Sequence, residues 1–140
     1  MRAALILILL LTLAGLGYWS TMRPSTTAAP ATPPTALAEV TLPEALSANA
    51  EIGKRAFDAK CAICHGPNAA AQSGIAPPLI HKIYETSHHA DEAFQRAVSH
   101  GVRQHHWPFG NMPLVEGLTR ADVTMIIAYI RQVQRANGIN

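Results

Sequence analysis

Hydrophobic and polar positions divide the chain into three parts. Residues 3–19 form an almost unbroken apolar run behind Arg2, and a stretch rich in Pro, Ala and Thr without a regular pattern follows. Beyond it, apolar residues recur at the three- and four-residue spacing of amphipathic helices. We therefore predict a membrane anchor or signal peptide, a linker and one folded domain, over residues 1–20, 21–47 and 48–140.

The N-terminal apolar run is suited to a membrane. It ends at Tyr18 and Trp19, residue types that favour the membrane interface. Its length lies at the lower limit for a spanning helix. A cleaved signal peptide is the alternative, but the small residues at positions 36 to 38 lie late for a cleavage site. We therefore favour an uncleaved anchor.

The Pro/Ala/Thr-rich segment is predicted to be a semi-extended spacer. Such a composition supplies too little apolar surface to build a core. Simple disorder without a tethering role is the alternative. If the anchor is retained, this linker sets how far the folded domain reaches from the membrane.

The first helix of the domain is predicted over residues 50–60, with Asn49 as its N-cap. Gly53 lies beside its apolar face, where the absence of a side chain allows a second helix to approach closely. Three apolar residues share that face: Ile52, Ala56 and Phe57.

Two further helices are predicted. One spans residues 90–100 and stops at Gly101. The other begins after Thr119, which forms a capping box with Asp122, and is closed by Gly138. Its buried stripe consists of Val123, Ile126, Ile127 and Ile130. No segment shows the alternation of a strand, so the domain is predicted to be all-α.

One motif carries specific chemistry. Cys61 and Cys64 are the only cysteines, and His65 follows directly. This is the spacing of c-type haem attachment, because two thiols about one helical turn apart can each bond a haem vinyl group while the histidine reaches the iron. A redox dithiol, a structural disulfide and half of a zinc site are the alternatives. The sequence shows neither the βαβ context of the first nor the second ligand pair of the last.

Charge and length set limits on these interpretations. The chain has 11 Lys and Arg against 9 Asp and Glu, a net charge of +2. That excess is too small to indicate a nucleic-acid partner. A domain of roughly 90 to 100 residues is only marginally stable alone. A tethered haem would add a large apolar body to its core and so help it to fold.

The domain resembles the class I cytochromes c. The resemblance rests on a helix that ends in the Cys61–Gly66 motif, on the Pro77–Leu79 segment, on the Met112–Pro113 pair and on a long C-terminal helix. It implies an all-α fold in which the N- and C-terminal helices cross over one covalently bound haem c.

The resemblance also implies roles for single residues. It makes His65 and Met112 the two iron ligands, although a methionine often only fills a core. It makes the carbonyl of Pro77 the acceptor of a hydrogen bond from the His65 ring, and it packs Leu79 on the haem face. For Trp107, a hydrogen bond to a haem propionate and a plain core position both stay open.

Six more histidines follow residue 80: His81, His88, His89, His100, His105 and His106. One interpretation is that His105 or His106 replaces Met112 on the iron. A second is that a group of these histidines binds copper or zinc. A third is that they are ordinary surface residues. A further hypothesis places His105 and His106 at the haem edge, where protonation tunes potential or partner docking.

The resemblance implies a monohaem electron carrier in a respiratory-type chain at the periplasmic face of a bacterial inner membrane. It would be soluble in the periplasm if the N-terminus were cleaved. Its expected partners are the membrane and redox proteins such as a dehydrogenase, an oxidase or a cytochrome complex. The alternatives are a haem enzyme or ligand sensor with a displaceable sixth ligand, and an accessory subunit of a larger oxidoreductase.

Overall fold

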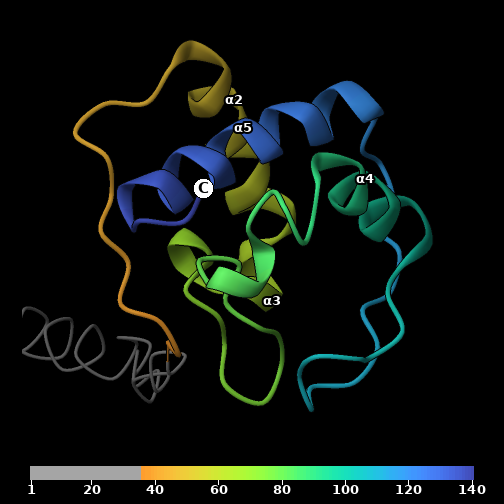
Figure 1. The fold of residues 1–140 in the computed structure, drawn as a ribbon. Coiled ribbons are helices and arrows are strands. Elements are labelled where there is room, and N and C mark those ends of the chain that lie inside the picture. Colours follow the sequence, from red (N-terminus) through yellow and green to blue (C-terminus); the bar gives the residue numbers. More distant parts are fainter. Residues whose placement is uncertain (1–35) are drawn as a thin grey trace, which may run out of the picture. The chain divides into compact units, whose positions relative to one another are not determined.

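The computed structural model describes residues 36–140, which Figure 1 draws as a coloured ribbon. The predicted anchor or signal peptide over residues 1–20 lies outside the described residues, as does the first part of the linker. Within the described part, no helix has the length and apolar character needed to cross a membrane.

Helices make up the regular structure of the described residues. They are α2 (Ala48–Lys60), α3 (Ala62–His65), α4 (Asp91–His100) and α5 (Arg120–Ala136), with 3-10 turns at Pro67–Ala69 and Lys82–Tyr84. The only β contacts within residues 36–140 are two isolated bridges. The prediction of an all-α domain is therefore confirmed for this part of the chain.

Helix α2 begins two residues earlier than predicted. Ser47, rather than Asn49, is its N-cap, and the Ser47 hydroxyl accepts a hydrogen bond from the backbone N–H of Ala50. The backbone N–H of Ser47 in turn donates to Gln132 of α5, at 3.0 Å. Both serine and asparagine are good N-caps, and the contact with α5 favours the earlier one.

The capping box that opens α5 is confirmed. The Thr119 side chain accepts from the backbone N–H of Asp122, and the Asp122 carboxylate accepts from the backbone N–H of Thr119 at 2.8 Å. The predicted stripe of α5 is also buried, and the helix adds Tyr129 and Val133 to it. The helix ends at Ala136, two residues before Gly138.

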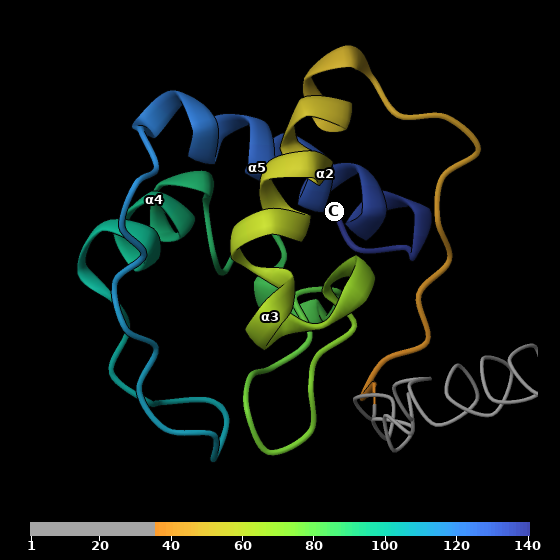
Figure 2. The ribbon, with the colours of Figure 1, turned by 180° about the vertical axis from the view of Figure 1, so that it is seen from behind.

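Helices α2 and α5 pack against each other and cross, as Figures 1 and 2 show. Gly53 makes their close approach possible, because a Cβ atom there would overlap the backbone carbonyl of Met125 in α5. One turn later the rings of Phe57 and Tyr129 lie 5.6 Å apart, centroid to centroid, and both side chains are fully buried. The expected crossing of the terminal helices is thus present.

The predicted apolar face of α2 is wrong at Ile52, whose side chain is 46% exposed. The buried residues of this helix are Ala50, Gly53 and Phe57. Their spacing of three and four residues directs the inner face away from Ile52.

Residues 37–47 do not behave as a spacer. The backbone N–H of Leu37 donates to the carbonyl of Ala70 at 2.9 Å. Thr41 and Asn137 exchange two hydrogen bonds, at 2.9 and 2.8 Å. Two apolar side chains of the segment pack against the core: Val40 and Leu46. Residues 37–47 therefore lie along the folded domain. Their apolar side chains were hard to recognise within a Pro-rich segment. The division of the chain into anchor, linker and domain stays a prediction.

Arg131 ties α5 to the segment before α4. Its side chain is only 10% exposed. It donates hydrogen bonds to the backbone carbonyls of Tyr84 and His89 and pairs with Asp91, at 2.9 Å between Nε and Oδ1. A buried guanidinium with its donors satisfied in this way fixes the backbone that it contacts.

We expect Gly53→Ala to destabilise the protein by about 2 kcal/mol, because the new methyl group forces α2 and α5 apart. Guanidinium chloride unfolding followed by circular dichroism measures the change. Ala59→Gly, on the exposed side of the same helix, is the matched control for helix propensity and should cost about 1 kcal/mol. A Gly53→Ala variant more stable than the original chain would contradict the close contact.

Candidate functional site

A cavity of about 670 Å³ lies beside the crossing of α2 and α5. Its walls come from the α2–α3 junction, the segment before the Lys82–Tyr84 turn, α4, the loop between α4 and α5, and the inner face of α5. The volume lies within the roughly 300–1,000 Å³ of cofactor sites. The predicted site residues all line it: Cys61, Cys64, His65, Pro77, Leu79, Trp107 and Met112.

The apolar face of α4 belongs to this cavity. Phe94, Ala97 and Val98 are each only half-buried, and all three line the cavity wall. A helix face that packed on protein alone would be buried. The half-burial of these side chains therefore indicates that a large apolar body completes the core at this point.

The two cysteines and the histidine lie on a single helical turn. Cys61 is both the C-cap of α2 and the N-cap of α3. The backbone N–H groups of Cys64 and His65 donate to the Cys61 carbonyl, at 3.1 and 2.9 Å. This turn brings both sulfur atoms and the imidazole to the same wall of the cavity.

The Cys61 thiol is unsuited to redox catalysis. Burial, with a smaller contribution from the neighbouring Cys64, raises the pKa of Cys61 to about 11. Reactive Cys-x-x-Cys thiols have lowered pKa values. Both cysteines are free, and the motif lies on a helix that follows another helix, without the βαβ surroundings of a thioredoxin-like site.

The hydrogen bond expected between His65 and Pro77 is present. The Nδ1–H of His65 donates to the Pro77 carbonyl at 2.9 Å. Burial lowers the pKa of His65, and the hydrogen bond offsets part of that effect. The ring is therefore held as a neutral imidazole whose Nε2 lone pair is free for a metal.

Leu79 is held at the same wall by two backbone contacts. Its N–H donates to Ala69 and its carbonyl accepts from the buried Gln134 of α5, at 2.9 and 2.8 Å. The side chain is 9% exposed and lines the cavity. The extended Pro77–Leu79 segment is therefore fixed from both ends.

Met112 lies on a different segment of the cavity wall. Its backbone forms a two-hydrogen-bond bridge with Val102, both bonds being 2.9 Å long. Gly101, which ends α4 with a φ of 75°, passes so close to the Met112 carbonyl that a Cβ atom would overlap it. The loop is therefore anchored at the end of α4, and Met112 lies at that anchor.

Trp107 has a buried indole N–H without a hydrogen-bond partner among the described residues. The centroid of its ring lies 5.1 Å from that of His81 and 6.0 Å from that of Phe109. A buried donor needs an acceptor, and an acidic group on a ligand in the cavity would supply one.

The sequence offered a metal-binding group of histidines as one interpretation but did not identify its members. The structure places His105 and His106 against His88 and His89 at the wall of the cavity that Met112 also lines. The pairs are about 17 residues apart, so only the two adjacent His-His pairs in the sequence hinted at the cluster. His100, on α4, does not line the cavity.

The structure thus has an apolar cavity, two thiols on one helical turn, an oriented imidazole and an unpaired buried donor. These features fit a covalently attached haem. The family model for cytochrome c matches residues 50–134, more than half of the chain, and the chain belongs to the cytochrome c family. With one attachment motif, it carries one covalent haem c. Searches of curated proteins and of solved structures found no match.

We expect replacement of the cysteines to remove the thioether bonds to haem one at a time. Cys61→Ala or Cys64→Ala should leave one thioether and shift the pyridine haemochrome band, whereas the double variant should carry no covalent haem. Haem staining of denaturing gels and the intact mass of the protein measure the outcome. His100→Ala, at a residue that does not line the cavity, is the control. Covalent haem on the double variant would refute attachment at these sulfur atoms.

Proposed function

We propose that this protein is a monohaem electron carrier whose iron is held by His65 and Met112. The observation that carries the proposal is that one cavity contains a fixed neutral imidazole on one wall and a methionine anchored on a separate loop. Bound haem supplies a one-electron ferric/ferrous couple. Such chemistry needs no substrate pocket, only a redox centre that a partner can approach.

The protein orients the first ligand through Pro77. A carbonyl that accepts the Nδ1 proton keeps His65 in one tautomer and increases the donor strength of Nε2. Because Gln134 and Ala69 hold the backbone at Leu79, the Pro77 carbonyl cannot easily move away. The proximal side is therefore preorganised.

Met112 is suited to be the second iron ligand. A thioether is a soft, neutral donor, and a methionine-histidine pair gives a higher reduction potential than two imidazoles. The bridge to Val102 and the contact with Gly101 hold its backbone. A methionine held in this way would serve as the second iron ligand, which favours a carrier over a catalyst.

The remaining predicted residues shape the environment. Leu79 and the half-buried face of α4 line the cavity and would exclude water from a bound haem. Trp107 could donate its unpaired N–H to a propionate. A propionate bonded in this way would also order the loop between α4 and α5, since Trp107 lies on it.

We place the carrier at the periplasmic face of a bacterial inner membrane, in a respiratory-type chain. The apolar run of residues 3–19 supports an anchor, and c-type haem attachment supports export. The partners would be a membrane dehydrogenase, an oxidase or a cytochrome complex, which such carriers meet through small, transient interfaces.

Variants of Met112 test the iron ligands. Met112→His should lower the midpoint potential, and Met112→Ala should open the sixth position so that the ferrous protein binds carbon monoxide. Optical redox titration and carbon monoxide difference spectra measure the two effects. Met125→Leu is the control, because this methionine lies on α5 and does not line the cavity.

The same measurements address the rival functions. Ready carbon monoxide binding by the unmodified ferrous protein would favour a haem enzyme or ligand sensor and would contradict the carrier. If the midpoint potential were unchanged in both Met112→His and Met112→Ala, Met112 would not be an iron ligand.

Membrane fractionation tests the anchor. We expect haem-stained protein in the washed membrane pellet of the producing cells, and a variant lacking residues 1–20 but carrying a cleavable export signal in the soluble periplasm. Release of the unmodified chain into the soluble periplasm with a shortened N-terminus would show a cleaved signal peptide instead.

A further inference from the structure

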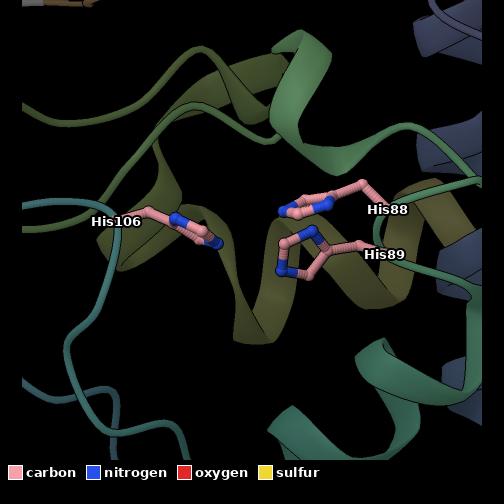
Figure 3. Close-up of side chains that lie close together, drawn as sticks. All are labelled: His88, His89 and His106. Atoms are coloured by element: carbon pink, nitrogen blue, oxygen red, sulfur yellow. The ribbon is translucent and has the colours of Figure 1, made fainter.

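Four histidines from two separate segments meet at the wall of the haem cavity. His88 and His89 precede α4, whereas His105 and His106 lie on the loop after it. Ring centroids of His88 and His106 are 5.5 Å apart, those of His89 and His106 5.4 Å, and those of His105 and His106 4.2 Å. Figure 3 shows the His106 ring facing the other two across a small gap.

Three of these rings converge on one point. One ring nitrogen from each of His88, His89 and His106 lies within 4.8 Å of the others. Around a tetrahedral ion with metal–nitrogen bonds of about 2.0–2.1 Å, ligand nitrogens are about 3.4 Å apart. His88 and His106 are exposed, so rotation of their side chains can close the remaining distance.

The segment that carries His88 and His89 is held in place by α5. Arg131 binds the carbonyls of Tyr84 and His89 and pairs with Asp91. These contacts fix the backbone on both sides of His88. Ligands presented by a fixed backbone bind a metal with less loss of entropy than ligands on a mobile loop.

The second segment is also fixed. Besides the bridge between Val102 and Met112, the Asn111 side chain accepts from the backbone N–H of Gln104 at 2.9 Å, and the Gln104 side chain accepts from Gly110 at 3.0 Å. The loop that carries His106 is therefore closed on itself by hydrogen bonds.

His89 is already oriented as a ligand. Its Nδ1–H donates to the carbonyl of Ile83 at 2.6 Å, which leaves Nε2 free. A ring nitrogen bonded to a backbone carbonyl is the usual second contact of a metal-binding histidine. His105 donates in the same way to the carbonyl of Arg103 at 2.8 Å, and its ring is tilted against that of His106, but it is not part of the group whose ring nitrogens converge.

From this geometry we propose that His88, His89 and His106 bind one divalent transition-metal ion of the zinc or copper(II) type at the rim of the haem cavity. Imidazole suits both metals. Three histidines leave a fourth position for water or an outside ligand. The site is separate from the iron ligands, and the proposal does not depend on Met112.

Crowding supports the site in a second way. Loss of hydration among the crowded rings, followed by the charges of neighbouring histidines, lowers the pKa of His106. Partial burial lowers the pKa of His89 as well, with the hydrogen bond to Ile83 offsetting part of that effect. Neutral imidazoles are the form that binds metals. The lowered pKa values of His89 and His106 thus favour the neutral, metal-binding form of these two rings at neutral pH.

The test uses the full-length, haem-loaded chain, purified without a polyhistidine tag and stripped with a chelator. Calorimetric titration with Zn²⁺ should show one ion per chain. His88→Ala and His106→Ala should each weaken binding at least about tenfold. Cu²⁺ added to the same protein should give an electron paramagnetic resonance spectrum with nitrogen couplings that both variants reduce.

His100→Ala is the matched control, since His100 is an exposed histidine outside the cluster, and it should bind Zn²⁺ as the unmodified chain does. His88 and His106 are surface residues, and unchanged haem absorption and circular dichroism would show that their variants fold. No bound Zn²⁺, or binding that neither variant weakens, would overturn the proposal. So would loss of a low-spin haem spectrum in His106→Ala, which would make His106 an iron ligand instead.

Discussion

The close packing of α2 on α5 is the contact on which the remaining structure depends. Gly53 lets the two backbones meet at Met125, and the Phe57–Tyr129 pair fills the space one turn further on. Because α3 continues directly from α2 at Cys61, the position of this crossing decides where both sulfur atoms and the imidazole lie. The attachment motif is therefore placed by a helix contact remote from it in sequence.

Helix α5 positions the opposite walls as well. Gln134 holds the Leu79 carbonyl, and Arg131 holds the backbone that leads to His88 and His89. Long loops would ordinarily be free to vary in position. Here two polar side chains from a single buried helix face convert a connecting segment into a fixed wall.

Local features were predictable from the sequence, whereas long-range ones were not. The Thr119–Asp122 capping box, the end of α4 at Gly101 and the attachment motif depend on neighbours within a few residues, so spacing alone revealed them. The start of α2 at Ser47 was missed because a contact with α5 decides it. The packing of residues 37–47 on the domain and the meeting of His88 with His106 likewise depend on tertiary contacts that no local pattern records.

The half-buried face of α4 explains why this domain needs its cofactor. Phe94, Ala97 and Val98 line a cavity instead of protein, so in the absence of haem their apolar surface would contact water and weaken a small core. A covalently bound haem would fill this cavity with an apolar body. The histidine cluster lies on the rim of this cavity, on segments that α5 and the loop's own hydrogen bonds hold in position. The contacts that form one edge of the haem cavity therefore also bring these histidines together.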